Sequence, residues 1–341
     1  MRRFLFFMMW VATLVAAVAG GGAGWWLVQP LDLGTGNDVT GGASGGVVDL
    51  SIEPGTSVRG VAQAAVDAGV RTQPAALYWW FRLSGKDRLI KAGSYEIEAG
   101  TTPYRLLNKL VRGEEALRSV TLVEGWTFTQ VRTALSKAEQ LKPDTRGLEG
   151  DLIMQQLAKP GVAPEGRFFP DTYTYAKGSS DLAVLRRAMR AMDKKLEAAW
   201  QLRAANSPLK SPEQLLTLAS IVEKETGRGS DRPLIAGVFT NRLKIGMLLQ
   251  TDPTVIYGMG DQFDGNLRRK DLQTDTPWNT YTRAGLPPTP IAMPGKAALL
   301  AAVQPAPTKA LYFVARGDGT SQFSASLEEH NRAVNKFQRG Q

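Results

Sequence analysis

The uncharged run at the amino terminus constrains this chain more than any other part of its sequence. The run extends from Phe4 to Val28 and directly follows Arg2 and Arg3. It is long enough to span the hydrocarbon core of a bilayer, and the preceding arginines place its start on the cytoplasmic side. Residues 1–3 are therefore predicted to be a cytoplasmic tail and residues 4–28 a transmembrane anchor.

A cleaved signal peptide is the alternative, since Ala17-Val18-Ala19 has the small residues of a cleavage site. Apolar residues continue beyond that site to Val28, which favours the uncleaved anchor. With either reading, the rest of the chain is exported. The glycine-rich segment 29–46 predicts a flexible tether, so that the globular part begins near Val47.

The chain contains no cysteine and only one histidine, His330. These counts exclude disulfides, thiolate nucleophiles, cysteine-ligated metal sites and two-histidine zinc motifs. A Ser–His–Asp triad would have to use His330. The chemistry of this chain must therefore rely on carboxylates, lysine, tyrosine, hydroxyls or a bound cofactor.

Basic residues outnumber acidic ones, 41 Lys and Arg against 32 Asp and Glu, which gives a formal net charge of +9. This balance suits a nucleic acid, an anionic lipid surface or an acidic polymer of the cell envelope, but also an ordinary soluble surface. The exported topology disfavours nucleic acid. The longest basic run is only Arg268-Arg269-Lys270, and no zinc-finger or basic-zipper pattern occurs.

Three segments share a strand–turn–helix pattern and predict an α+β fold. Strands are expected at 47–52, 89–97 and 120–123, and each is followed by a glycine turn, a Ser or Thr cap and a helix. A further helix at 74–84 gives the order β-α-α-β across 47–98. This order resembles a LysM-type glycan-binding module, although a unit that only packs remains open. The pattern predicts a LysM-like subdomain at 47–117 and a second α+β domain at 118–338.

In the second domain, one carboxylate lies on the apolar side of a predicted helix that starts at Ser211. At 100° per residue, Glu225 falls on the same stripe as Leu218 and Ile221, whereas Glu223 points the opposite way. Burial and the negative end of the helix both raise the pKa of such a carboxyl group, which suits a general acid. Alternatively, Glu225 ends the stripe and reaches solvent, where it pairs with Arg228.

Most glycosidases use two carboxylates, and Asp252, Asp171 and Glu124 are the candidates for a second one here. The loops at 246–295 are rich in Gly, Pro, Asn, Asp and Tyr and are long for a mere connection, so functional residues are expected there.

Several motifs together are specific enough to indicate a family. They are LASIVEKET from Leu218, NRL from Asn241, LQTDPTVIYG from Leu249, NTY from Asn279, GLPP from Gly285, and the upstream EGWT from Glu124 and FPDTY from Phe169. In these motifs, over about 47–338, the chain resembles the MltG (YceG-like) endolytic murein transglycosylases. The resemblance implies a LysM-like subdomain and an α+β YceG-like catalytic domain that cleaves nascent peptidoglycan strands at the inner membrane.

The resemblance also implies a catalytic residue. Lytic transglycosylases place a single Glu in an I-x-x-x-E-[ST] helix end, which residues 221–226 match, with Glu225 as the catalytic residue. This Glu protonates the bond between N-acetylmuramic acid and N-acetylglucosamine and then deprotonates the muramyl 6-hydroxyl, which attacks C1. The product is a 1,6-anhydromuramyl end, and no metal or other cofactor is needed.

The candidate substrate-binding residues are Gln250, Thr251, Asp252, Asn279 and Tyr281 for hydrogen bonds and Tyr173 for stacking on a sugar. The alternative is that the polar residues among them only shape their loops. The implied partners are peptidoglycan glycan strands, the inner membrane and peptidoglycan synthases (penicillin-binding proteins), with the catalytic domain in the periplasm. A hydrolytic muramidase and a non-catalytic regulator of synthases that binds glycan remain alternative functions.

Overall fold

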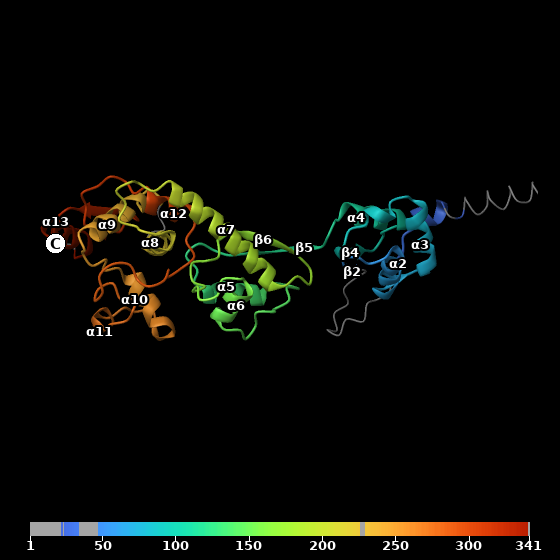
Figure 1. Ribbon diagram of the computed structural model, residues 1–341, viewed down its shortest axis with the longest axis horizontal. Coiled ribbons are helices and arrows are strands. Elements are labelled where there is room, and N and C mark those ends of the chain that lie inside the picture. Colours follow the sequence, from blue (N-terminus) through green and yellow to red (C-terminus); the bar gives the residue numbers. More distant parts are fainter. Residues whose placement is uncertain (1–21, 23, 34–46, 226–228, 340–341) are drawn as a thin grey trace, which may run out of the picture. The chain divides into compact units, whose positions relative to one another are not determined.

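The computed structural model describes residues 22, 24–33, 47–225 and 229–339 (Figure 1). Most of the expected anchor (4–28) and tether (29–46) lies outside these residues. No helix in the described ranges is both long and apolar enough to cross a membrane. The fold is mixed α+β with small two-stranded sheets, as the sequence predicts. The chain divides into two compact units: Ala176–Gly178 belong with the part up to Arg118 in unit 1, and the remainder forms unit 2.

Unit 1 is built on an antiparallel hairpin with two helices inserted between its strands. Its elements are β1 (Asp32–Leu33), β2 (Val47–Ile52), α2 (Val58–Asp67), β3 (Val70–Arg71), α3 (Pro74–Leu83), η1 (Asp87–Leu89), β4 (Gly93–Glu98) and α4 (Pro103–Arg112). β2 pairs with β4 from Val47↔Glu98 to Ile52↔Gly93, and β1 pairs with β3. Alternate residues of β2 are buried, so one face of the hairpin covers the core.

Unit 2 is mainly helical. Its elements are β5 (Leu117–Thr121, which crosses the division), α5 (Phe128–Lys137), α6 (Gly150–Gln156), β6 (Thr172–Ala176), α7 (Asp181–Gln201), α8 (Pro212–Glu225), α9 (Arg232–Lys244), α10 (Asp252–Met259), η2 (Gly260–Gln262), α11 (Arg269–Gln273), α12 (Lys296–Val303), β7 (Tyr312–Ala315), β8 (Ser321–Ser324) and α13 (Leu327–Gln338). β5 pairs with β6, and β7 with β8. α8 is the central helix, because it contacts α7, α9, α10 and α12.

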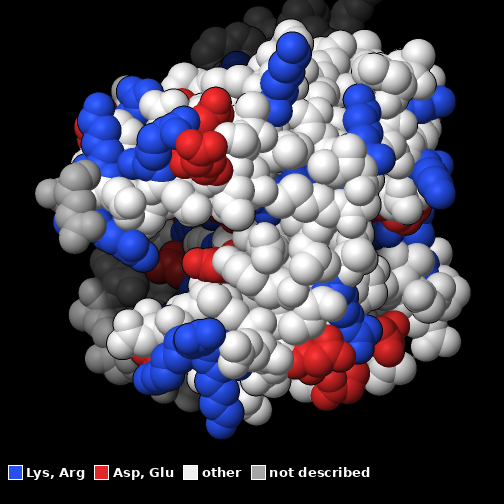
Figure 2. All heavy atoms as spheres, turned by 90° about the vertical axis from the view of Figure 1, so that its left-hand side faces the viewer, with Lys and Arg blue, Asp and Glu red and all other residues white. Residues whose placement is uncertain are grey.

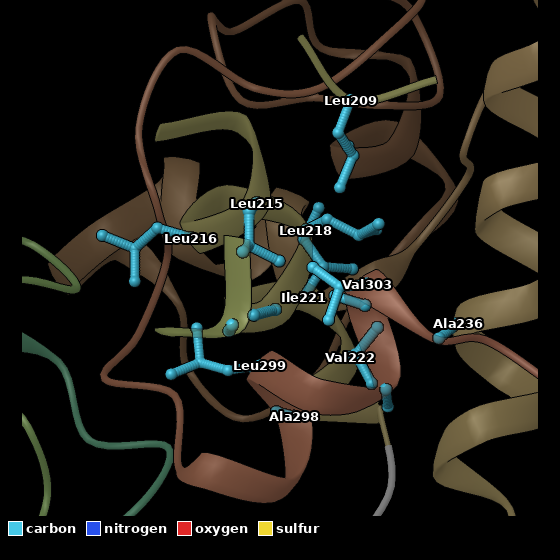
Figure 3. Packing of buried hydrophobic residues seen from close by; sticks show 14 of the residues in the cluster. Leu209, Leu215, Leu216, Leu218, Ile221, Val222, Ala236, Ala298, Leu299 and Val303 are labelled. Atoms are coloured by element: carbon cyan, nitrogen blue, oxygen red, sulfur yellow. The ribbon is translucent and has the colours of Figure 1, made fainter. Parts of the chain in front are cut away.

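The burial of α8 fixes the position of its carboxyl-terminal end. Every residue from Leu215 to Val222 is buried. Figure 3 shows Leu218, Ile221 and Val222 packed near Val303 of α12. Each fully buried side chain of this size contributes about 1.5–3 kcal/mol to folding. Residues at the last turn of α8 are therefore held by a rigid, well-packed helix.

Candidate active site

Glu225 is the last residue of α8 and is partly buried. Burial raises the pKa of its carboxyl group, in the direction that the helical projection predicts. The hydroxyl of Thr251 donates a hydrogen bond to its Oε1 atom, which favours the charged form and acts against the burial. The carboxyl group is thus held in one orientation while its proton is retained to higher pH than in an ordinary glutamate.

Thr251 is held in place by a network of hydroxyls. Its side chain is only 2% exposed. Its N–H donates to Thr280 Oγ1 (3.1 Å), and its carbonyl accepts from Thr254 Oγ1 (2.7 Å). The preceding residue, Gln250, has a φ of 48° and donates its N–H to the carbonyl of Thr280 (3.1 Å). The loop before α10 is therefore fixed against the loop at Thr280, and Thr251 is aimed at Glu225.

Replacement of Thr251 by valine tests this contact. The shape is almost unchanged, and the side chain of Thr251 makes no capping hydrogen bond to α10 that valine would lose. We expect the pKa of Glu225 to rise further, so that the falling limb of the pH–rate profile moves to higher pH. The rate near neutral pH should fall by about tenfold, since a hydrogen bond to a charged group is worth about 1.5 kcal/mol. Thr251→Ser, which keeps the hydroxyl, should restore the profile, and an unchanged profile in Thr251→Val would contradict the role of the contact.

A second carboxylate, Asp252, also acts on Glu225. It is the first residue of α10, and its charge raises the pKa of Glu225 further. The hydroxyl of Tyr281 donates to Asp252 Oδ1 (2.6 Å), and burial followed by the effect of Asp252 raises the pKa of Tyr281. Tyr281 therefore stays a donor at all ordinary pH values. Of the three candidates for a second carboxylate, Asp252 is the one whose charge bears on Glu225.

Arg242 supplies a buried positive charge on the same side of the unit. Its charge favours ionised Glu225. The guanidinium donates to the carbonyls of Leu311 (2.7 Å), Leu248 (3.2 Å) and Leu249 (2.8 Å) and lies 5.2 Å from the centre of the Tyr312 ring. Arg242 therefore ties the chain before β7 to the segment that leads into Gln250 and Thr251.

The other two predicted binding residues lie in the interior. Asn279 is fully buried, and its amide donates to the carbonyls of Leu272 (3.1 Å) and Thr274 (2.7 Å) while its oxygen accepts from the N–H of Tyr281 (2.8 Å). Tyr173 belongs to a hydrophobic cluster, and its hydroxyl donates to the carbonyl of Phe169 (2.7 Å). Asn279 therefore shapes the loop that presents Tyr281, and the structure does not bring Tyr173 to Glu225.

Burial alone does not distinguish Glu225 from Glu223. The Glu223 side chain is only 6% exposed, and burial raises its pKa as well. However, Glu223 accepts from Arg232 (3.3 Å) and from the N–H of Gly295 (2.8 Å), which precedes α12. Glu223 thus joins α8 to α9 and α12, whereas the bond from Thr251 is the one that the described residues make to Glu225. Because the described residues give Glu225 this one hydrogen bond, whereas Glu223 has an ion pair and a backbone hydrogen bond, Glu225 is the better candidate for chemistry.

Glu165 is a buried carboxyl group that the sequence pattern does not single out. Its oxygens accept from the N–H of Phe128, at the start of α5 (3.1 and 3.2 Å), and from the hydroxyl of Tyr257 in α10 (3.2 Å). Burial raises its pKa from 4.5 to about 7, although both hydrogen bonds favour the charged form. Glu165 lies in a loop without hydrophobic periodicity, so only its position between Pro164 and Gly166 sets it apart in the sequence.

The raised pKa of Glu165 predicts a pH-dependent stability. Because the folded protein binds this proton more tightly than the unfolded chain, the contribution is fully present below pH 4.5 and is lost as the pH rises toward about 7. The loss amounts to about 3 kcal/mol. Glu165→Gln should abolish this part of the pH dependence in urea unfolding, whereas Glu213→Gln, at an exposed position of α8, should retain it. Parallel pH dependences for Glu165→Gln and the unmodified protein would contradict the assignment.

No group of three or more His, Cys, Asp or Glu residues that could hold a metal ion occurs within the described residues.

Figure 2 shows the face of unit 2 that lies on the left-hand side of Figure 1. This face is hollowed on one side, with acidic side chains visible in the recess and Lys and Arg side chains around it. The arrangement at Glu225 offers a carboxyl group with a raised pKa, a neighbouring carboxylate, a buried cation and hydroxyl donors. This set of groups is suited to acid–base chemistry on a polar, uncharged bond.

Comparisons with known proteins agree with this chemistry. The model of a family described as YceG-like matches residues 50–336. A protein of Bacillus subtilis (strain 168) named endolytic murein transglycosylase is 32% identical over 85% of this chain and 84% of its own. A protein of Streptococcus pneumoniae with the same name is 28% identical over 84% of this chain, which spans 58% of that protein's length. The crystal structure of a yceG-like protein from Listeria monocytogenes, 28% identical, aligns with a TM-score of 0.53 over 84% of this chain and 98% of that one.

Proposed function

We propose, from the premise that the chain belongs to the YceG-like family, that Glu225 is the catalytic acid and base of an endolytic murein transglycosylase. The resemblance to this family that the sequence motifs indicate is confirmed, and the enzyme is a lytic transglycosylase that acts on peptidoglycan. The position of Glu225 is the main support for this catalytic role. Its carboxyl group has a raised pKa, lies at the end of a rigid helix and accepts a hydrogen bond from Thr251.

In the first step Glu225 acts as the acid. It gives its proton to the glycosidic oxygen between N-acetylmuramic acid and N-acetylglucosamine as the bond to C1 breaks. The raised pKa keeps this proton available to higher pH than in an ordinary glutamate, which suits a general acid. The leaving sugar departs with its new hydroxyl, and positive charge develops at C1 and the ring oxygen.

In the second step the same carboxylate acts as the base. It takes the proton of the muramyl 6-hydroxyl while that oxygen forms a bond to C1, which yields a 1,6-anhydromuramyl end and returns Glu225 to its acid form. No water is consumed. Because the nucleophile belongs to the sugar that it attacks, its effective concentration is high. The hydroxyl of Thr251 and the charge of Arg242 both favour the ionised form of Glu225 between the two steps.

Asp252 and Tyr281 are also assigned to the site. The negative charge of Asp252 opposes ionisation of Glu225 and is suited to stabilise the positive charge that develops at C1. Tyr281 donates to Asp252 and holds that carboxylate in place. Gln250 has an exposed side chain and is assigned to hydrogen bonds with the sugar or its peptide.

Residues 4–28 are assigned as a single-pass anchor in the inner membrane, with residues 1–3 in the cytoplasm and the catalytic domain 118–338 in the periplasm. Of the expected tether at 29–46, residues 31–33 pack on unit 1, so a free tether is not proposed for them. Residues 47–117 are assigned as a LysM-like subdomain, in support of which α2 and α3 are observed between the paired strands β2 and β4, with the two-residue strand β3 between the helices. Nascent glycan strands are the substrate, and peptidoglycan synthases are the proposed neighbours.

Mass spectrometry of digested, uncrosslinked glycan strands tests the proposal. We expect new 1,6-anhydromuramyl ends, with early products of intermediate length because the cleavage is internal. Only reducing ends would instead identify a muramidase that uses Asp252 as its second carboxylate. No cleavage by the unmodified protein would favour a glycan-binding regulator.

A further inference from the structure

One helix of unit 1 exposes large apolar side chains. α3 buries Leu77 and Phe81 completely on one side. On the other side it exposes a stripe formed by Ala75, Trp79 and Leu83, together with Arg82. Trp79 is 59% exposed, and Leu83, at 80%, is more exposed than any other large apolar side chain of the described residues. A contiguous apolar stripe of this kind on a soluble unit marks an interaction surface.

Further exposed apolar residues lie where the amino-terminal segment joins unit 1. Trp25 and Val28 are 66% and 65% exposed, and Tyr104, at the start of α4, is 52% exposed. The indole N–H of Trp80 in α3 donates to the carbonyl of Pro103 in α4 (3.1 Å), and the Trp80 and Tyr104 rings lie 6.4 Å apart. We call the surface formed by Trp25, Val28, Trp79, Leu83 and Tyr104 the aromatic face.

The amino-terminal segment is attached to unit 1 beside this surface. Leu31 is buried in the core, and its N–H donates to the carbonyl of Thr101 (2.8 Å), two residues before α4. Asp32 and Leu33 pair with β3, which leads into α3. Trp26 packs against the core of unit 1. Figure 1 shows the short helical segment that ends at residue 28 beside α3 at one end of this unit.

The length of the connection limits how far unit 1 can lie from the end of the apolar run. Only two residues, Gln29 and Pro30, lie between Val28 and Leu31, and the chain from Val28 to Leu31 spans at most about 10 Å. If residues 4–28 cross a membrane, as proposed above, unit 1 must therefore lie at the surface of that membrane. Tryptophan and tyrosine are enriched in this interfacial region because one end of each ring is apolar and the other polar.

The charges around the aromatic face also match a lipid surface. Neither α3 nor α4 contains an acidic residue, whereas α4 carries Arg105, Lys109 and Arg112. The guanidinium group of Arg82 forms an ion pair with the carboxylate of Asp87 (2.5 Å). The aliphatic side chains of Leu83 in α3 and of Val28 in the amino-terminal segment are suited to acyl chains.

We propose that the aromatic face inserts into the headgroup region of the membrane that holds the amino-terminal anchor, while the basic side chains of α4 contact anionic lipid. This inference rests on the proposed anchor. It adds that unit 1 is a peripheral membrane module, which is fixed against the bilayer instead of moving freely on a linker.

The absence of cysteine permits a direct test in the full-length protein, since a single introduced cysteine is the only labelling site. Leu83→Cys is compared with Leu117→Cys, which is also in unit 1 and is 56% exposed. Both are labelled with an environment-sensitive fluorophore and reconstituted into vesicles of phosphatidylcholine and phosphatidylglycerol, with or without lipid brominated in the upper acyl chain. We expect brominated lipid to quench the label at position 83 and to leave the label at position 117 unchanged.

Equal quenching at the two positions in protein that floats with the vesicles would overturn the inference and leave the anchor in place. If the protein does not float with the vesicles, both the inference and the proposed anchor are overturned. A label at position 83 that responds to soluble glycan strands but not to brominated lipid would identify a sugar-binding face and also overturn it. Cleavage of soluble strands by the same preparations reports on the catalytic proposal separately.

Discussion

Glu225→Gln should reduce the cleavage of glycan strands by about a thousandfold or more, because one residue supplies both the acid and the base. The amide cannot protonate the glycosidic oxygen or accept the proton of the 6-hydroxyl. It does retain an oxygen that can accept the hydrogen bond from Thr251. The substitution also removes a buried ionisable group whose charged form is disfavoured, so the fold should be at least as stable as that of the unmodified protein.

Glu213→Gln is the matched control for this variant. Glu213 lies on the same helix, in its exposed first turn, and undergoes the same chemical change. Initial rates of both variants on uncrosslinked strands, together with their circular dichroism spectra, check the prediction. Full activity of Glu225→Gln would remove Glu225 from the mechanism, and an equal loss in Glu213→Gln would show that the helix, not the carboxyl group, is affected.

Arg242→Met should destabilise the protein by about 3 kcal/mol, because the carbonyls of Leu248, Leu249 and Leu311 lose their donor in a buried position. The same loss should release the segment that leads to Thr251, so that activity falls together with stability. Urea unfolding at fixed pH measures the first effect, and strand cleavage well below the unfolding transition measures the second.

Arg332→Met provides the comparison. Arg332 is on α13 and makes an exposed ion pair with Glu328 (2.7 Å). Surface pairs of this kind contribute less than about 1 kcal/mol. A free energy of unfolding for Arg242→Met as high as that for Arg332→Met would show that water or other groups satisfy the three carbonyls.

Local sequence signals predicted the beginnings of helices well. Ser57, Thr102 and Thr127 each accept a hydrogen bond from a backbone N–H in the first turn of the helix that follows, and Thr127 forms a capping box with Gln130. These contacts are made within four residues, so that the chain beyond them hardly affects them. The predicted helix at 74–84 is observed as α3, at Pro74–Leu83.

Strand boundaries were predicted less well. The strand expected at 89–97 is β4, which starts only at Gly93, because Asp87–Leu89 form a turn of 3-10 helix and the N–H of Lys91 donates to Leu110. The strand expected at 120–123 is β5, which ends at Thr121. A strand ends where its partner ends, and the partner of β5 is β6, some fifty residues away in the chain.

The candidate site shows the same difference between features that the local sequence determines and features that depend on other segments. Periodicity identified the orientation of Glu225 because the helix alone determines it. It did not show that Glu223 would be as buried as Glu225, since the burial of Glu223 depends on Arg232 and Gly295. The contact of Glu165 with Tyr257 likewise depends on a segment that is distant in the sequence. The hydrogen bonds of Asn279 are made to nearby residues, but in a loop without periodicity, which no sequence pattern predicts.

The source of the oxygen at the new chain end tests the central claim most directly. Glycan strands are digested in water enriched in the heavy oxygen isotope, and the new muramyl ends are analysed by mass spectrometry. Because the muramyl 6-hydroxyl is the nucleophile, we predict anhydro ends that contain no oxygen from the solvent, formed by the unmodified protein and by Glu213→Gln but not by Glu225→Gln. Heavy oxygen at the new ends would show that water attacks C1 and would contradict the assignment of Glu225 as the acid and base of a lytic transglycosylase.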